Sequence, residues 1–492
     1  MKAGRQDYSM LSPRRPLTLS LLHSPASWLA SAAFVLSILI IRLPLEYSLG
    51  LLVGTGLLAA SAWEPAIGLS LAISLGPAKA YLAAARPDLP ADWGQIFFAF
   101  AAAGWLARGA LNRKIIIPYV GLFLPLGLYI GVGLFSLLPA LSIEEGLKEA
   151  LKWIEIAVGM VILITEMERG RVRWIIGGIL VAGLIQAAIG VWQFEFREKG
   201  PEAFRILGTH YRAYGTFEQP NPYGGFLGLI WPLAAGLAIE SMKEAGRRKP
   251  ASLLLASSSF LLASSFMLAS LYFSFSRGAW LGAAAAGLAM AVALPRRWPV
   301  GVGLALAAFG TGFALLRAGL IPASIANRLA EAADFVAVTD VRGANINDLN
   351  FAIVERLAHW QAAQAMAQAN PWLGVGLGNY AAAYPQFRLF NWENALGHAH
   401  MIYLNVLAET GVLGLMTYVI LWGSIIALTI RATSRTTGTA RGLALGLLGV
   451  WTHLSLHQIV DNLYVNNIHF LIAGLLALLT YASRPPKDTA RV

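Results

Sequence analysis

The sequence contains no cysteine and little charge. Of its 492 residues none is Cys, and Asp, Glu, Lys and Arg together make up 13%. The lack of cysteine excludes disulfides, thiolate catalysis and zinc–thiolate centres. The low charge argues against an ordinary soluble domain, in which about a quarter of the residues are charged. We find no internal repeat at a fixed period and no segment with the composition of a soluble domain.

Long apolar runs are abundant instead. Hydrophobic residues make up 57% of the chain and the mean hydropathy is +0.61. A membrane-spanning helix needs about 20 apolar residues, and a helix satisfies its own backbone hydrogen bonds inside lipid. We therefore predict an all-α fold, a polytopic transmembrane helical bundle of about 12–14 spans that forms a single integral membrane domain over 1–492. The expected spans are 27–42, 46–62, 65–83, 93–109, 115–137, 145–166, 173–193, 223–240, 252–273, 277–294, 299–316, 411–430, 440–456 and 464–481.

The distribution of charge predicts how the chain crosses the membrane. The formal net charge is +11. If the N-terminus is cytoplasmic and the spans alternate, the inner segments hold an excess of Lys and Arg, such as GRRK at 246–249 and RR at 296–297. The outer segments then hold an excess of Asp and Glu. This positive-inside pattern predicts cytoplasmic termini and an uncleaved first span. It also attributes the basic charge to topology, so no nucleic-acid partner is expected.

Two outer segments are longer than ordinary connections, 194–222 and 317–410. Loops of such length are usually functional. In the second, the apolar residues of 351–368 recur at helical spacing, which predicts an amphipathic helix that lies along the membrane or caps the bundle. NPWLGVGLGNY follows it at 370–380. Because no strand precedes its glycines, we interpret this stretch as a structural loop and not as a dinucleotide site.

Polar residues are concentrated on the outer side. RAYGTFEQPNPYGG at 212–225 and SRG at 276–278 each place an arginine in an outer turn. A guanidinium near lipid normally has a partner, and its planar donors suit a phosphate or carboxylate. Arg212 and Arg277 therefore either bind a lipid diphosphate or serve as structural cations, for example in an ion pair between Arg212 and Glu218.

Most histidines also fall in outer loops or at outer span ends. His398 and His400 form an HxH motif. A metal site needs further ligands, which the neighbouring sequence does not clearly supply, so no metal is predicted. The remaining alternatives are a structural hydrogen bond at a helix start and a general-base role. His457 and Asp461 are four residues apart and would share one face of a helix, with a cap or a local pair as the alternative.

Taken together, these segments resemble the O-antigen ligase and polymerase superfamily over roughly 175–465. The resemblance rests on the order and spacing of R-x-x-G-T-F-x-x-P-N, S-R-G, E-R-x-x-x-W with a later P-x-x-G-x-G, and A-H-x-x-Y-L-x-x-L-A-E-x-G. Here they span Arg212 to Asn221, Ser276 to Gly282, Glu355 to Tyr380 and Ala399 to Gly411. Members are multi-span glycosyltransferases of the bacterial inner membrane that take a glycan from an undecaprenyl diphosphate carrier on the periplasmic side.

The resemblance implies residue roles. Arg212 and Arg277 match the arginines that hold the diphosphate, and His400 matches the histidine that takes the hydroxyl proton or orients the acceptor. The family often has Asn after this histidine, whereas here Met401 follows it and His398 is an extra histidine, so either one could act. No cofactor is expected. The expected substrate-binding residues are Arg356, His398, Tyr214, Asn221, His457 and Asp461.

The resemblance also implies a function. It predicts a GT-C-like glycosyltransferase, O-antigen ligase-like and metal-independent, that acts at the periplasmic face. The expected partners are an undecaprenyl-diphosphate-linked glycan donor, lipid A core or another glycan as acceptor, and membrane lipids. A polymerase and a protein glycosylation enzyme share the donor chemistry and stay open. A lipid-linked glycan flippase or transporter would need polar groups near mid-membrane and often repeated halves, which the sequence lacks. A structural subunit of an export complex is the third alternative.

Overall fold

The computed structural model describes residues 44–87, 92–248, 251–321, 340–347 and 350–484. The chain forms two compact units, 1–60 and 61–492, and α2 (Leu45–Trp63) begins in the first. The expected span 27–42 and both termini lie outside the described residues. Everything below concerns the second unit.

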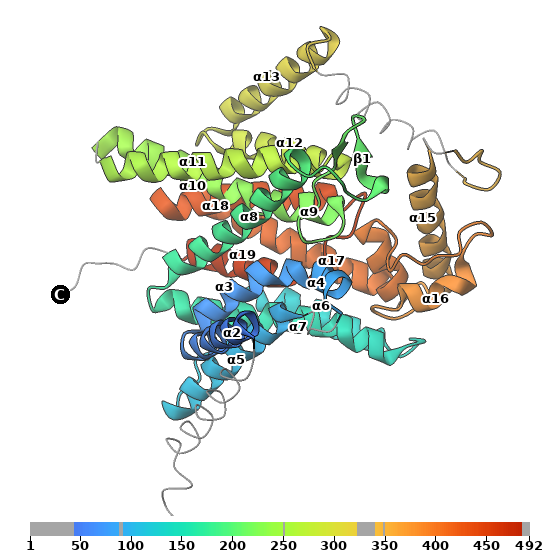
Figure 1. Ribbon diagram of the computed structural model, residues 1–492, viewed down its shortest axis with the longest axis horizontal. Helices are drawn as coiled ribbons and strands as arrows, with labels where there is room; N and C mark the ends of the chain where they lie inside the picture. Colours follow the sequence, from blue (N-terminus) through green and yellow to red (C-terminus); the bar gives the residue numbers. More distant parts are fainter. Residues whose placement is uncertain (1–43, 88–91, 249–250, 322–339, 348–349, 485–492) are drawn as a thin grey trace, which may run out of the picture. The chain divides into compact units, whose positions relative to one another are not determined.

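Helices account for nearly all the regular structure of the described residues, which confirms the all-α prediction (Figure 1). The N-terminal helices of the second unit are α3 (Pro65–Leu75), η1 (Gly76–Ala78), α4 (Lys79–Ala85), α5 (Trp93–Leu111), α6 (Phe123–Phe135), α7 (Ile143–Glu168) and α8 (Val172–Glu195). Next come η2 (Glu202–Phe204), β1 (Arg205–Ile206), β2 (His210–Tyr211), α9 (Pro220–Gly228), α10 (Trp231–Arg248), α11 (Ala251–Tyr272), α12 (Arg277–Ala293) and α13 (Trp298–Arg317). The C-terminal helices are α15 (Phe351–Ala369), α16 (Tyr380–Phe387), α17 (Ile402–Arg435), α18 (Gly438–His457) and α19 (Ile468–Ala482).

Six helical stretches among the described residues are long and apolar enough to cross a membrane. They are Pro65–Ala85, Val172–Glu195, Pro220–Arg247, Ala251–Tyr272, Trp298–Arg317 and Ile402–Arg435. Shorter apolar helices coincide with further expected spans, among them Phe123–Phe135, Arg277–Ala293 and Ile468–Ala482. A polytopic helical bundle is therefore confirmed, whereas the larger number of spans stays a prediction.

Several expected spans have different boundaries in the structure. The span expected at 223–240 is divided into α9 and α10, and α6 begins at Phe123 instead of 115. Pro220 occupies the first turn of α9, where a proline costs no hydrogen bond because that N–H has no partner inside the helix. Apolar composition alone does not reveal such breaks, because the residues on both sides of the break are equally apolar.

The helices α10, α12 and α18 pack closely through small residues. A Cβ atom on Gly236 would come within 2.3 Å of the backbone oxygen of Gly442, so only glycine permits this approach of α10 to α18. Small residues at spacings of four are the usual means of close helix contact in membranes. This packing holds the C-terminal end of α18, where His457 lies, against α12.

The longest helix, α17, is broken at Gly411, which has φ 64° and ψ −166°. The expected structural loop inserts at this break: Val375 N donates to Ala408 O at 2.9 Å, and Val412 N donates to Pro371 O at 2.8 Å. The loop thereby satisfies backbone groups that the break leaves open. The glycine-rich loop packs into this break as a structural loop, and α17 begins at Ile402, nine residues before the expected span.

Replacing Gly411 by alanine is expected to destabilise the protein. Its backbone conformation is one that only glycine adopts readily, and strain of this kind costs about 1–3 kcal/mol. A Cβ atom would also lie 2.3 Å from the carbonyl carbon of Trp372. The measurement is the thermal unfolding midpoint in detergent. Gly423→Ala is the control on the same helix, because its Cβ would meet no atom within 4 Å. Equal midpoints for the two variants would contradict this account.

The predicted amphipathic helix is present as α15. Its buried residues include Ile353, Leu357 and Met366, and it packs against α16 and α17. Figure 1 shows α15 running across the direction of the long helices, at the same side as β1 and α16. It therefore covers the end of α17 at which His398 and His400 lie.

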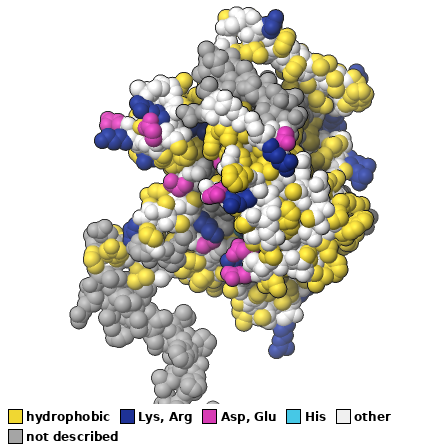
Figure 2. All heavy atoms as spheres, turned by 90° about the vertical axis from the view of Figure 1, so that its right-hand side faces the viewer, with side chains coloured by type: hydrophobic (Ala, Val, Ile, Leu, Met, Phe, Trp, Pro, Cys, Tyr) yellow, Lys and Arg dark blue, Asp and Glu magenta, His cyan; other side chains and the backbone are white. Residues whose placement is uncertain are grey.

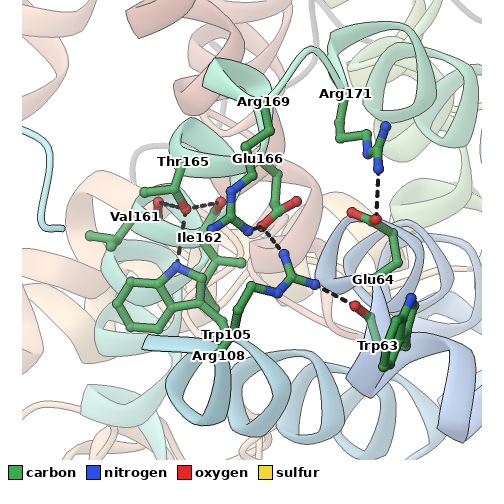
Figure 3. A network of polar contacts seen from close by, with 10 residues as sticks. All are labelled: Trp63, Glu64, Trp105, Arg108, Val161, Ile162, Thr165, Glu166, Arg169 and Arg171. Carbon is green, nitrogen blue, oxygen red and sulfur yellow. Dashed lines mark hydrogen bonds and ion pairs between the residues drawn. The ribbon is translucent and has the colours of Figure 1, made fainter. Parts of the chain in front are cut away.

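A charged network joins the C-terminal ends of α5 and α7 (Figure 3). Glu166 is buried, and its carboxylate contacts Arg108 at 3.1 Å and Arg169 at 2.9 Å. Arg171 contacts Glu64 at 3.0 Å beside it. Buried charges are tolerated when they are paired in this way. The network links the C-terminal ends of these two helices. None of its residues belongs to the site described next.

Candidate active site

The first of the two loops expected at the outer face, 194–222, folds onto the turn that precedes α12. Its short strands pair antiparallel, with Arg205 opposite Tyr211. Directly after β2, Ala213 N donates to Phe273 O at 2.8 Å, and the Arg212 guanidinium donates through Nε to Ser274 O at 2.9 Å. Arg212 Nη2 also donates to Asn221 Oδ1 at 3.3 Å. Arg212 is thus tied to Ser274, 62 residues later in the chain, in the turn that leads into Arg277.

Arg277 is the first residue of α12. The Ser276 hydroxyl caps this helix by accepting from Ala279 N at 3.4 Å. The N-terminus of a helix attracts anions because its backbone N–H groups lack partners inside the helix. The next residue, Gly278, lies so close to the end of α18 that a Cβ there would come within 2.6 Å of His457 Cδ2. The structure therefore places both predicted arginines at one turn, next to His457.

Tyr214, an expected substrate-binding residue, is engaged by the protein itself. It is buried, and its hydroxyl accepts a hydrogen bond from Arg197, whose guanidinium lies 5.8 Å from the ring centre. Burial raises the pKa of the Tyr214 hydroxyl. Its backbone N–H donates to Gln193 Oε1 at 2.9 Å. These contacts assign Tyr214 to holding the loop in place. Asn221 supports the site indirectly through Arg212.

His398 and His400 lie together in the loop before α17. Their ring centres are 4.4 Å apart, and His400 N donates to His398 Nδ1 at 3.1 Å. His400 has a φ of 53°, a conformation that is uncommon for residues other than glycine and often found at functional sites. Ala399 N donates to Asn405 Oδ1 at 3.0 Å, which fixes the turn against the first part of α17.

Asp461 faces His400 from the segment after α18. Its Oδ1 atom is 3.7 Å from His400 Nδ1 and accepts from Asn462 N at 2.8 Å. Only 5% of Asp461 is exposed. Burial acts to raise the pKa of this carboxyl, but the contact with His400 and the charges of the neighbouring histidines lower it more, so the pKa lies well below its ordinary value. Asp461 is therefore ionised beside His400.

Of the two arrangements considered for His457 and Asp461, a shared helix face is not the one found. The helix α18 ends at His457, so the two residues do not share a helix face. His457 is buried, and its Nδ1 atom lies 3.4 Å from His453 Nε2. The carboxylate of Asp461 turns instead to His400, which lies 61 residues earlier in the sequence. A contact between such distant segments could not be read from local spacing.

Three side chains of this cluster are arranged so that they could also hold a metal ion. The ligand atoms of His398, His400 and Asp461 all lie within 4.8 Å of one another. Two imidazoles and a carboxylate suit several divalent metals. Sequence analysis found no third ligand for the HxH motif because Asp461 is supplied by another segment. The same arrangement is also that of a histidine oriented by a carboxylate for proton transfer.

The helices α15 and α16 each add one residue to the cluster, His359 and Tyr380. The His359 ring lies 5.7 Å from the His400 ring, and its Nδ1 atom is 2.8 Å from the Tyr380 hydroxyl. Burial, and then the charge of His400, lower the pKa of His359 to about 4. Sequence analysis did not include His359 and Tyr380 in the site. The sequence signal that could have identified His359 is its spacing from Arg356, which puts both residues at adjacent positions of one helix face.

Arg356 offers an unused donor at this place. Its Nη1 group donates to Ala352 O at 2.9 Å, whereas its Nε group is buried without a hydrogen-bond partner among the described residues. A buried donor without a partner is costly unless a ligand supplies the acceptor. Burial, the charge of His400 and, to a lesser extent, that of Arg356 lower the pKa of His398 to about 4. Arg356 lies on α15, one turn before His359.

The depressed pKa values of His359 and His398 predict a loss of stability in acid. Each has a folded pKa of about 4, below its ordinary 6.5. Between these values the unfolded chain binds more protons, so stability falls as the pH falls from 6.5 towards 4. His359→Gln is expected to make this fall shallower. The measurement is the unfolding midpoint between pH 7.5 and 4.5. His210→Gln, in the first outer loop, is the control. An unchanged slope for His359→Gln would contradict the assignment.

The O-antigen ligase family model matches residues 262–419. The match covers about a third of the chain, from α11 into α17, and includes Arg277, Arg356, His398 and His400. Arg212 and Asp461 lie outside the matched residues but contact residues within them. No curated protein matches the chain. The match confirms the resemblance seen in the sequence: residues 262–419 of this membrane protein are similar to the O-antigen ligase family.

Proposed function

We propose that this protein is a glycosyltransferase that moves a glycan from an undecaprenyl diphosphate carrier to an acceptor hydroxyl, in the manner of an O-antigen ligase. The observation that carries the proposal is the approach of Asp461 to the His398 and His400 pair within the superfamily segment. A carboxylate that orients an imidazole is the arrangement needed for a general base. We also propose that the site lies at the periplasmic face of the bacterial inner membrane, with both termini in the cytoplasm.

In the proposed reaction the acceptor oxygen attacks the anomeric carbon of the donor sugar. The new carbon–oxygen bond forms as the bond from that carbon to the carrier diphosphate breaks, and undecaprenyl diphosphate leaves. His400 takes the hydroxyl proton, and Asp461 stabilises the imidazolium that results. Arg277, Arg212 and the donor end of α12 stabilise the negative charge that grows on the diphosphate, which preorganised donors do effectively in a site shielded from water.

The arginines provide the positive charge that a metal ion supplies in other transferases, so the proposed reaction is metal-independent. The competing use of the cluster is a divalent cation held by His398, His400 and Asp461. The general-base role and cation binding exclude one another, because a bound cation would occupy the imidazole nitrogen that must accept the proton. Transfer that survives EDTA supports the metal-independent reaction, and transfer that EDTA abolishes and a divalent cation restores supports the cation.

Reconstitution of transfer tests the proposed function and identifies the acceptor. The purified protein is mixed with an undecaprenyl-diphosphate-linked glycan and, separately, with lipid A core, a second carrier-linked glycan or a serine-rich protein. Product on one acceptor is the expected result, and the acceptor that is used distinguishes ligase, polymerase and protein glycosylation. Absence of product on all three, together with movement of the carrier across vesicles, would contradict the proposal in favour of a flippase.

A further inference from the structure

A cavity of about 930 Å³ lies beside the histidine cluster. It is lined by the N-terminal half of α7, the end of the glycine-rich loop, the loop that holds His398 and the segment from Asn462 to His469. Its volume is at the upper end of the range for small-molecule sites, so it has room for more than one sugar ring. Because His398 lines the cavity and lies beside His400, the cavity adjoins the proposed base.

The cavity lies apart from the residues assigned to the diphosphate. Neither Arg212 nor Arg277 lines it, and no arginine occurs among its described lining residues. Phe217 and Glu218, which follow Arg212 in the first outer loop, form part of its wall. The cavity therefore adjoins the proposed donor site without sharing its cations, which is the relation expected of an acceptor site.

The charges of the cavity disfavour an anionic ligand. Apart from Glu409, which is buried and accepts a hydrogen bond from Tyr380 N, four glutamates line it against three lysines. Each lysine is already paired with a carboxylate: Lys79 with Asp92 at 2.7 Å, Lys148 with Glu145 at 2.8 Å and Lys152 with Glu149 at 2.6 Å. Figure 2 shows the face that carries α15 and α16, where acidic and basic side chains lie next to one another in small groups. A cleft with excess negative charge raises the local concentration of cations and lowers that of anions.

The remaining wall suits sugar hydroxyl groups. Its carboxylates and amides, from Glu218, Asn405, Asn462 and other residues, accept hydrogen bonds from hydroxyls, and the amides also donate. Three aromatic rings stand together at one side: Trp153 lies 4.6 Å from Tyr129 and 5.1 Å from Tyr464, measured between ring centres. Aromatic faces with a few polar groups are the usual lining of sites for partly apolar ligands such as sugar rings.

We infer that this cavity binds the acceptor, and that the acceptor is a glycan of neutral or amine-bearing sugars and not a phosphate-rich oligosaccharide. The inference rests on the proposed function and gives its acceptor a chemical class. A phosphate-rich acceptor would bring negative charge against glutamates with no unpaired lysine to receive it. A neutral glycan meets hydroxyl-binding groups and aromatic rings throughout.

Equilibrium dialysis without donor tests the binding separately from transfer. The probes are a labelled neutral oligosaccharide and the same oligosaccharide carrying two phosphates. The proteins are the wild type, the cavity variant Glu145→Gln/Glu218→Gln, and the control Glu195→Gln/Glu198→Gln. The control removes the same charge from residues that do not line the cavity. The wild type is expected to bind the neutral probe about tenfold or more tightly than the phosphorylated one.

In the cavity variant, the ratio of the affinity for the neutral probe to that for the phosphorylated probe is expected to fall several-fold. In the control, this ratio is expected to stay unchanged. Equal or tighter binding of the phosphorylated probe, no binding of the neutral probe, or the same preference in the cavity variant would overturn the inference. A preference that narrows equally in the control would also overturn it, because net charge would then be the cause. None of these outcomes requires transfer, so they are distinguishable from a failure of the proposed function.

Discussion

Replacing His400 by alanine is expected to lower the rate of glycan transfer by about 10²–10⁴-fold, the usual contribution of a positioned general base. The imidazole lies 3.7 Å from the buried carboxylate of Asp461, which holds the charge that appears when the proton is taken. Both of its ring nitrogens are buried and form no hydrogen bond with any described group. The measurement is the initial rate with saturating donor and acceptor.

Two comparisons separate proton transfer from structural damage. His398→Ala is expected to cost less than His400→Ala, because Asp461 contacts His400. Asp461→Asn is expected to lower the rate by a smaller factor than His400→Ala and to shift its dependence on pH, because the imidazolium loses its counter-charge. His210→Ala, in the first outer loop, is the control. A His400→Ala variant that is folded and fully active would contradict the role of this residue and leave His398 as the alternative base.

Replacing Arg277 by alanine is expected to lower the rate by about 10²–10³-fold, as removal of a preorganised charge-stabilising donor does elsewhere. Arg277 stands at the first position of α12, so its guanidinium and the helix N-terminus act on the same anion. Arg277→Lys is expected to recover only part of the rate, because an ammonium lacks the planar pair of donors that a phosphate accepts. The measurement is the transfer rate at several donor concentrations.

Arg212→Ala is expected to lower the transfer rate by a similar factor, but for two reasons. Its guanidinium also ties the first outer loop to Ser274 O and Asn221 Oδ1, so its loss displaces the loop as well as the charge. Arg205→Ala, in the same loop and paired with the exposed Glu202, is the matched control. If Arg277→Ala transferred at the wild-type rate while remaining folded, the diphosphate site would have to lie elsewhere.

The all-α fold could be predicted from the sequence because each membrane-spanning helix is encoded by a local run of apolar residues. Apolar runs of spanning length locate most helices within a few residues. The errors occur where distant segments decide the backbone. The glycine-rich loop inserts at the break of α17 at Gly411, and the helix begins at Ile402. Nothing in the apolar pattern marks either the break or the helix start.

The site was predicted in part, for the same reason. Arg212, Arg277, Arg356, His398 and His400 were recognised individually by their chemistry in an apolar chain. The pairing of Asp461 with His400, the contact of His359 with His400 and the engagement of Tyr214 by Arg197 depend on tertiary packing. A single sequence fixes the types of residue at the site, whereas their mutual distances follow only from the folded bundle.

The most direct test of the central claim is the release of undecaprenyl diphosphate by the purified protein, measured in the same reaction as the glycan product. The account predicts release that depends on acceptor, one carrier for each glycan transferred, and that is lost together with the product in both His400→Ala and Arg277→Ala. Release at the wild-type rate in both folded variants, or carrier release without product, would contradict the claim that these residues form a transferase site.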